Sequence, residues 1–204
     1  MSFADEYFNR DIAQHEMQVI RDDGVNRHIR FKRPGTMCMH FDLLTWPGYL
    51  CYTGDMGTYV FSRLQDMFEF FRRHESRKPY QIDLRYWAEK LQSSDKTDGV
   101  RRWSADKFRA DVIDYFQECT EECPHTRKTE LWEEIESRVL MPAENGEHFA
   151  WAALYDFEHE GFSFTDWERD SEVWSHRFQW CCHALEWAIA AYDASKPEVA
   201  AVAA

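Results

Sequence analysis

Several features that would quickly place a protein in a class are missing from this sequence. No apolar run approaches the roughly 18 residues that a helix needs to cross a bilayer. Residues 1–11 have neither the basic segment nor the apolar segment of a secretory signal peptide. The GxSxG, HExxH and DxDxDG motifs of common nucleophilic and metal-dependent sites are also missing. These absences favour a cytoplasmic protein that does not contact the membrane and is not an enzyme.

The cysteines do not have the spacing of a small disulfide framework. Two of the six form a C-x3-C-x-H arrangement with a histidine, and two adjacent ones precede another histidine; the six are Cys38, Cys51, Cys119, Cys123, Cys181 and Cys182. A structural zinc site needs four nitrogen or sulfur ligands in tetrahedral geometry, and the C-x3-C spacing departs from the usual C-x2-C. We therefore expect reduced thiols, no bound metal and no cofactor.

The sequence is rich in aromatic residues, which make up 16% of it and include nine Trp and fifteen Phe. With 204 residues, the chain is long enough to bury a substantial core. The predicted fold class is α+β, with a small antiparallel β-meander over about 18–53 packed against a mostly helical remainder. We expect one domain over 1–195, in which 18–73 supply the sheet and first helix and 83–195 form a helical, acidic part. Residues 196–204 are predicted to be a disordered tail.

Turn signals divide residues 18–53 into four short strands. The turns are Asp23-Gly24, Pro34-Gly35 and Pro47-Gly48. Ile29 and Phe31 alternate with polar neighbours, and residues 37–46 alternate in the same way, which is the period of a half-buried strand. Beyond them, Thr58 is predicted to cap a helix over 58–73, because the apolar residues there recur at spacings of three and four.

Further helices are expected downstream. Ser104 is a predicted N-cap for a helix to about residue 118, and other helices are expected over 83–91, 130–140 and 149–157, with a short strand or loop over 162–167. The strongest helical pattern covers 173–194, which is apolar over most of its circumference. Such a helix lies either at the centre of a core or in an interface. A homodimer through Trp180 and Trp187 is therefore one prediction.

The net charge of −13 is concentrated in the second half of the chain. Residues 1–103 hold 16 Lys+Arg and 15 Asp+Glu, whereas residues 104–204 hold 8 and 22. An acidic surface repels nucleic acid and attracts basic partners. The predicted binding surface consists of acids that lie close to aromatic residues in this half: Glu130, Glu133, Glu134, Glu158, Glu160, Asp166, Glu168, Asp170 and Glu172. The simpler alternative is a solvated face without a partner.

A second candidate site lies near the end of the predicted sheet. His40 and Asp42 are predicted to share one face of a strand, with His28 nearby, and an imidazole oriented by a carboxylate is the usual general base. Asp55 belongs to the 54–58 loop, which is predicted to precede a helix N-terminus, where anions bind. No nucleophile motif accompanies the pair and the loop has no lysine, so a structural ion pair and a structural turn remain the simpler interpretations.

Two stretches carry a resemblance to a known group of proteins. The run RPGTMCMHFDLLTWPGYLCYTGDMGTYVFSRLQDMFEFF and the downstream stretch YDFEHEGFSFTDWE…FQWCCHALEWAIAAYD resemble an uncharacterised family of small acidic proteins encoded by phages and prophages of proteobacteria. The resemblance covers most of residues 15–195 and implies no catalytic residues. Small acidic phage proteins are often counter-defence factors, including anti-CRISPR proteins that occupy nucleic-acid grooves.

The resemblance and the charge together lead to one main hypothesis. The protein is expected to be a phage-encoded, non-enzymatic inhibitor of a bacterial defence system, acting in the host cytoplasm without binding nucleic acid itself. Its expected partner is a host defence protein or complex with a basic groove. Two alternatives stay open: an enzyme or small-ligand binder using the sheet face near His40 and Asp42, and a phage regulatory or structural accessory protein.

Overall fold

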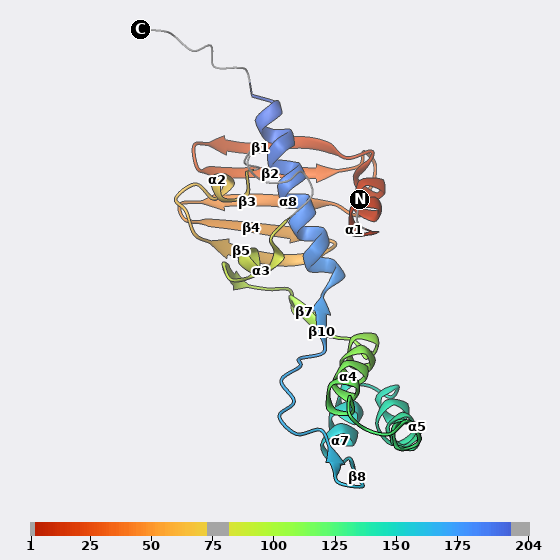
Figure 1. Ribbon diagram of the computed structural model, residues 1–204. Coiled ribbons are helices and arrows are strands. Elements are labelled where there is room, and N and C mark those ends of the chain that lie inside the picture. The colour runs from red at the N-terminus through yellow and green to blue at the C-terminus, as the bar shows by residue number, and fades with distance from the viewer. Residues whose placement is uncertain (1–2, 73–81, 197–204) are drawn as a thin grey trace. The chain divides into compact units, whose positions relative to one another are not determined.

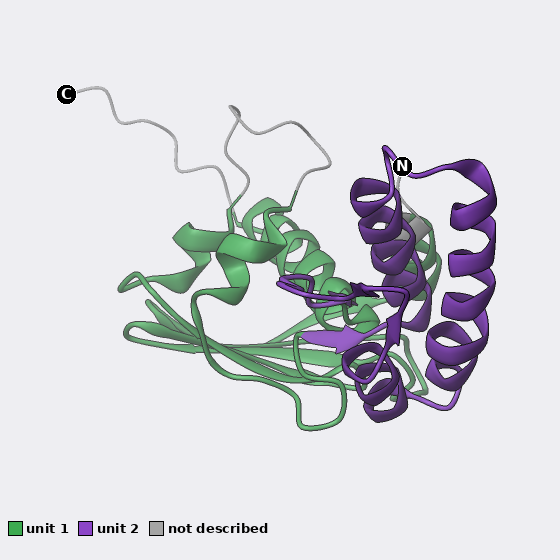
Figure 2. Cartoon of the chain, turned by 60° about the horizontal axis from the view of Figure 1, so that its bottom comes forward, with its two compact units in different colours: residues 1–100, 174–204 green, residues 101–173 purple. Residues whose placement is uncertain are grey.

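The computed structural model describes residues 3–72 and 82–196 and has the predicted α+β fold (Figure 1). Helices account for 43% and strands for 25% of the chain, so helix dominates. The chain divides into two compact units (Figure 2). Unit 1 comprises residues 1–100 and 174–204, and unit 2 is the intervening segment 101–173. Because compact units need not fold independently, one domain over 1–195 stays a prediction.

Unit 1 is built on a six-stranded antiparallel sheet in which every strand pairs with its neighbours in sequence. Its strands are β1 (Glu16–Asp23), β2 (Asn26–Lys32), β3 (Phe41–Trp46), β4 (Tyr49–Gly54), β5 (Gly57–Ser62) and β6 (Leu91–Ser93). The predicted turns at Gly24 and Gly48 are confirmed, and both glycines have positive φ, at 58° and 85°. Glycine adopts this backbone conformation without steric cost, so short turns between antiparallel strands are possible there.

The sheet has two unlike faces because its register keeps apolar residues in rows. One row joins Ile29, Leu43, Tyr52 and Tyr59, all fully buried. The adjacent row joins His28, Leu44, Cys51 and Val60, all only half-buried. Figure 2 shows the helices of unit 1 on one side of this sheet. We call that side the covered face and the other the open face.

The covered face packs against helices from both ends of the chain. These helices are α1 (Phe3–Ile12), α2 (Met67–Phe71), α3 (Leu84–Ala88) and α8 (His176–Ala194). Phe41 illustrates the packing, since its ring stacks on Phe31 at 4.9 Å and meets Trp180 of α8 edge-on at 5.6 Å. The helix predicted over 173–194 is thus confirmed as a core helix, starting after the N-cap Ser175.

The predicted helix over 58–73 is wrong in its first half. Residues 57–62 form strand β5, and the short helix α2 starts only at Met67, capped by Asp66. Thr58 caps nothing; its hydroxyl pairs with that of Thr53 across the strands at 2.8 Å. Tyr59 and Phe61 are both fully buried, which is the period of a strand. The apolar residues of this stretch fit the period of a helix as well as that of a strand, and hydrogen bonding to β4 selects the strand.

Unit 2 is mainly helical and has its own hydrophobic cluster. Its elements are β7 (Arg101–Trp103), α4 (Ala105–Cys119), α5 (His125–Ile135), the π-helical turn η1 (Glu136–Leu140), α6 (Met141–Ala143), α7 (Glu147–Tyr155), the hairpin β8 (Glu158–His159) with β9 (Phe162–Ser163), and β10 (Glu172–Trp174), which pairs with β7. The cluster centres on Phe108, Val112, Ile135, Val139 and Ala150, each fully buried.

The helix boundaries of unit 2 agree with the prediction at the start of α4 but not at the start of α5. Ser104 is the N-cap of α4, its Oγ accepting from the backbone N–H of Lys107 at 3.2 Å. The helix predicted over 130–140 starts five residues earlier, at His125, and ends as the π-helical turn. The predicted tail 196–204 lies, apart from Lys196, outside the described residues. Within the described ranges, no helix is long and apolar enough to span a bilayer.

Candidate functional site

The negative charge of the protein resides in unit 2. This unit holds 8 Lys+Arg and 19 Asp+Glu, a net charge of −11, whereas the rest of the chain has a net charge of −2. The segment that carries the excess negative charge is therefore the same segment that forms compact unit 2. All nine acids of the predicted binding surface lie in unit 2.

Five of these acids gather where α5 meets the β8–β9 hairpin. Arg138 pairs with Glu134 at 3.3 Å and donates to the backbone carbonyl of Glu158 at the same distance. Arg127 donates to the carbonyl of Glu160 at 2.9 Å and lies 3.7 Å from its carboxylate. Two arginines therefore hold the hairpin against the helix. Three of the five acids, at positions 130, 133 and 158, are exposed and make no side-chain ion pair among the described residues.

The other four acids follow one another in the 166–172 segment, which α4 and β7 hold in place. Arg101 lies 2.7 Å from Asp170 and 3.8 Å from Glu172. A hydrogen bond from the Glu172 N–H, together with Arg101, lowers the pKa of Asp170. Asp166 and Glu168 are exposed and have no ion-pair partner in the described part of the chain.

The structure therefore divides the predicted surface into two acidic clusters. Arginine partners partly neutralise four of the nine acids: Glu134, Glu160, Asp170 and Glu172. The remaining five keep their charge exposed to solvent. Surface pairs of this kind contribute little to stability, about 0–1 kcal/mol each. The free acids are thus available for a partner without disturbing contacts within unit 2.

On the open face of unit 1, Asp42 of β3 contacts two residues of the neighbouring strand β2, His28 and Arg30, rather than His40. Both oxygens of its carboxylate accept from Arg30 at 2.8 Å, and one also contacts Nε2 of His28 at 2.7 Å. Burial works to raise the pKa of Asp42, but the hydrogen bonds from Arg30 and His28 outweigh it and the pKa is lowered. The expected proximity of His28 is confirmed.

The predicted pairing of His40 with Asp42 is wrong. β3 begins at Phe41, and His40 belongs to the preceding turn, in which Met39 has a φ of 59°. His40 Nδ1 lies 2.7 Å from the carbonyl of Met37 and 3.1 Å from the carboxylate of Asp55. Asp55 also accepts from the Met39 N–H at 2.6 Å. A turn replaces the end of the expected strand, so the two aspartates serve separate clusters.

The cysteines form no metal centre within the described ranges, where no group of three or more His, Cys, Asp and Glu side chains could hold an ion. All six cysteines are free thiols. Burial raises the pKa of Cys181 and of Cys182 well above the ordinary thiol value, so these two stay protonated in the core. Cys119 and Cys123 line a cavity of about 180 Å³ together with Arg127 and Lys128.

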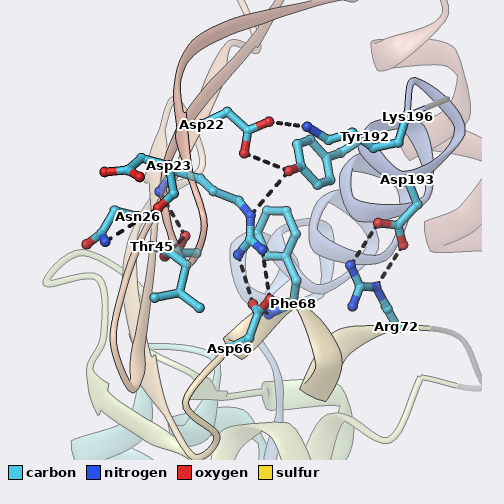
Figure 3. Close-up of polar contacts among 12 residues, drawn as sticks. Asp22, Asp23, Asn26, Thr45, Asp66, Phe68, Arg72, Tyr192, Asp193 and Lys196 are labelled. Carbon is cyan, nitrogen blue, oxygen red and sulfur yellow. Dashed lines mark hydrogen bonds and ion pairs between the residues drawn. The ribbon is translucent and has the colours of Figure 1, made fainter. Parts of the chain in front are cut away.

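Sequence reasoning missed a buried ion pair in unit 1. Arg27 is 8% exposed, forms a two-pronged contact with Asp66 at 2.8 and 2.7 Å, and donates to the hydroxyl of Tyr192 at 3.4 Å. The same hydroxyl donates to Asp22 at 2.8 Å, and Lys196 also contacts Asp22 (Figure 3). Nearby, Arg72 binds Asp193 at 2.9 Å through two nitrogens (Figure 3).

This network fastens the C-terminal part of α8 and the start of α2 to the sheet. Burial works to raise the pKa of Asp66, but Arg27 and the Phe68 N–H donate to its carboxylate and lower the pKa overall. One signal in the sequence could have revealed this ion pair. Arg27 lies two residues before Ile29 and four before Phe31, so the strand period places all three side chains on the covered face. A buried arginine requires an acidic partner.

The face proposed for a homodimer is largely internal. Trp180 is 2% exposed and packs edge-on against Phe8 at 5.1 Å, with its Nε1–H donating to Asp11 at 3.3 Å. Trp187 is half-buried against the same cluster, 5.4 Å from the ring of Phe31. Trp180 is therefore a core residue in this fold rather than an interface residue. A homodimer as such stays a prediction.

Comparisons with known proteins provide no relative from which to transfer a function. No protein-family model matches this chain, and no curated protein and no solved structure is significantly similar to it. The candidate sites therefore rest on the geometry and charge described above.

Proposed function

We propose that this protein is a non-enzymatic binding protein whose unit 2 docks on a basic surface of another macromolecule. The observation that carries the proposal is the coincidence of charge and structure: a net charge of −11 is confined to a single compact unit of 73 residues, while the larger unit is nearly neutral. A charge needed only for solubility would not have to be segregated in this way. A segregated charge steers a basic partner to one part of the molecule.

The exposed acids suit this role. Glu130, Glu133, Glu158, Asp166 and Glu168 are exposed and make no ion pair within the described part of the chain. They can bind lysine and arginine of a partner without first losing an internal partner. Charge complementarity of this kind mainly raises the association rate and falls with ionic strength.

The resemblance to phage proteins supports a specific form of the proposal. In that form, the partner is a nucleic-acid-handling defence complex of a bacterial host, the acidic unit occupies the groove that normally holds nucleic acid, and the site of action is the host cytoplasm. An enzymatic role receives less support from the open face, because both oxygens of Asp42 are engaged by Arg30 and His28.

The test is capture of the partner from a proteobacterial host lysate with the tagged full chain, followed by binding measurements on the purified partner. We expect affinity that falls steeply with salt and competition with the partner's nucleic acid, because both ligands would neutralise the same basic groups. A triple charge reversal in unit 2, Glu130→Lys, Glu133→Lys and Glu158→Lys, should slow association most.

The matched control reverses three exposed acids of unit 1 that also lack an ion pair among the described residues: Glu6, Glu16 and Glu69. The two triple variants change the net charge equally. Similar binding by both would show that the location of the charge is irrelevant. Affinity independent of salt, or simultaneous binding of protein and nucleic acid, would contradict groove occupation.

A further inference from the structure

The most exposed large apolar side chains of the described residues all lie in one short stretch of unit 2. Met141 of α6, Phe149 of α7 and Tyr155 at the end of α7 are 62%, 53% and 69% exposed. The other exposed large apolar side chains of the described ranges are only 38–46% exposed. Single exposed apolar residues are common, whereas a group of them with a polar border marks an interaction site. We call these three residues the α6–α7 patch.

The sequence of α7 makes this helix apolar on its outer side as well as its inner side. Residues 149–155 read FAWAALY, and none of them is charged. Ala150 and Leu154 are buried in the core of unit 2. Phe149, Ala152 and Tyr155 are exposed and follow one another at a spacing of three residues, which keeps them on one side of the helix. A helix that is apolar on all sides is normally buried, so the exposed side of α7 has the composition of an interface.

The charge around this patch has a single sign. From residue 139 to residue 168 the chain holds seven Asp and Glu and no Lys or Arg. Glu144 in the turn before α7 and Asp156 at its end are exposed, and neither makes an ion pair with any described residue. Nucleic acid, an anionic membrane and a second copy of this chain would all bring negative charge to the patch and be repelled. A partner surface with Lys and Arg would be attracted.

We propose that the α6–α7 patch docks in an apolar groove of a partner protein whose border carries Lys and Arg. The inference rests on the proposed function, because it names the part of unit 2 that makes the contact and the chemistry of the partner's surface. Phe149 and Tyr155 bury their rings in the groove, and Glu144 and Asp156 pair with the basic border. In protein interfaces, aromatic residues at the centre supply most of the affinity and charges at the rim steer association.

The experiment measures the binding of two labelled peptides to the full chain by fluorescence anisotropy. One peptide is an amphipathic helix of leucine and lysine, which represents the partner because it combines an apolar face with a basic border. The other peptide has the same length and charge, but glutamine replaces every leucine. The leucine peptide should bind at least about 10-fold more tightly, since only it can cover the exposed rings. Equal affinities would show that charge alone acts and would overturn the proposal.

A double variant, Phe149→Gln with Tyr155→Gln, removes both rings and keeps the net charge. Both side chains are more than half exposed and glutamine favours helix, so the variant should fold normally, as circular dichroism can check. It should weaken binding of the leucine peptide at least about 10-fold. The matched control, Trp46→Gln with Tyr49→Gln, removes two exposed rings from unit 1 and should keep full affinity. Equal weakening by both variants would overturn the proposal.

The thioether of Met141 provides a measurement that does not depend on variants. Met141 belongs to the patch and Met37 to unit 1, and both side chains are exposed, so dilute hydrogen peroxide should oxidise both to the sulfoxide. Bound leucine peptide should slow the oxidation of Met141, measured by mass spectrometry, and leave the rate at Met37 unchanged. An unchanged rate at Met141 under saturating peptide would place the contact elsewhere and contradict the assignment.

Other occupants of the patch would give different results. Self-association that the Phe149→Gln and Tyr155→Gln variant abolishes would identify a second copy, and binding to vesicles of uncharged phosphatidylcholine would identify a membrane; either result would overturn the proposal. With the captured host partner, weaker binding after the triple charge reversal but not after loss of the two rings would overturn this inference and leave the proposed function standing. If neither variant weakened that binding, both would fail.

Discussion

Unit 1 and unit 2 use charge in opposite ways. In unit 1, Asp42 and Asp66 are largely buried, and arginines hold both through two-pronged contacts of 2.7–2.8 Å. In unit 2, pairs such as Arg109–Glu136 are about half exposed on both sides, and many acids have no partner among the described residues. Charge is thus part of the internal architecture of unit 1, whereas in unit 2 it lies mostly at the surface, apart from the buried carboxylate of Asp111, which Lys107 and Ser171 contact.

The largest expected effects come from the two cores, which share no residue. Phe41→Ala in unit 1 and Phe108→Ala in unit 2 should each cost about 3–5 kcal/mol, because each ring is fully buried among other aromatic rings. Hydrogen exchange should show that Phe108→Ala weakens amide protection in α4 and α7 and spares β2 to β4. Equal loss of protection throughout the sheet would show that the two units unfold together as one cooperative unit.

Breaking one ion pair in each unit should reveal a difference between the units that is nearly as large, measured as the loss of unfolding free energy. Arg27→Met leaves the carboxylate of Asp66 buried without its guanidinium, and should destabilise unit 1 by about 3–5 kcal/mol. Arg109→Met breaks an exposed pair of unit 2 and should cost at most about 1 kcal/mol. Urea denaturation of both variants measures the difference. Similar losses of unfolding free energy would mean that the Arg27 network does not stabilise unit 1.

The pH dependence of unit 1 follows from the same carboxylates. The pKa values of Asp42 and Asp66 are lowered in the fold relative to the ordinary value of 3.8. A group with a depressed pKa stabilises the fold above its unfolded pKa and loses that contribution as pH falls through the folded value. Stability of unit 1 should therefore be constant from neutral pH to about 5 and decrease below about 4.

Denaturation midpoints measured across that range, with tryptophan fluorescence and exchange in β2 as probes, provide the check. Arg27→Met is the control, because Asp66 loses its main hydrogen-bond donor there and the slope below the ordinary carboxyl pKa should become shallower. A stability that rises on acidification would contradict the assigned sign.

The smallest expected effects concern two helix caps. Ser104→Ala removes a half-buried cap of α4 and should cost about 1 kcal/mol. Ser175 is fully buried, and its hydroxyl both accepts from Phe178 and donates to the carbonyl of Gly99 at 3.1 Å. Ser175→Ala should therefore cost more, near the upper end of about 2 kcal/mol. Thermal unfolding ranks the two; a reversed order would show that burial of the cap is unimportant.

Much of the local structure was predictable because its causes are local. The glycine turns at 24 and 48 and the serine cap at 104 act within a few residues, so the sequence specifies them by itself. The apolar stripe of α8 likewise identifies a core helix. The stretch from 57 to 71 was misjudged because its apolar residues fit a helix and a strand equally, and local pattern cannot separate the two.

The candidate sites were predictable in residue type but not in geometry. The acidic content of 104–204 is visible in the sequence, whereas the arginines that neutralise Glu134, Glu160, Asp170 and Glu172 emerge only after folding. A cleft lined by Arg10, His15 and Arg33 gave no signal in the sequence, because Arg33 lies far along the chain from the other two.

The sequence alone determined where the strands of the first hairpins turn, where helix α4 starts, and which part of the chain carries the charge. Each of these depends on neighbouring residues or on composition. Only the tertiary structure decided that residues 57–62 join a sheet, that Arg27 meets Asp66 and Tyr192, and that His15 lines a cleft. These depend on contacts between residues far apart in the chain, whose partners are fixed by packing of the whole fold rather than by local preference.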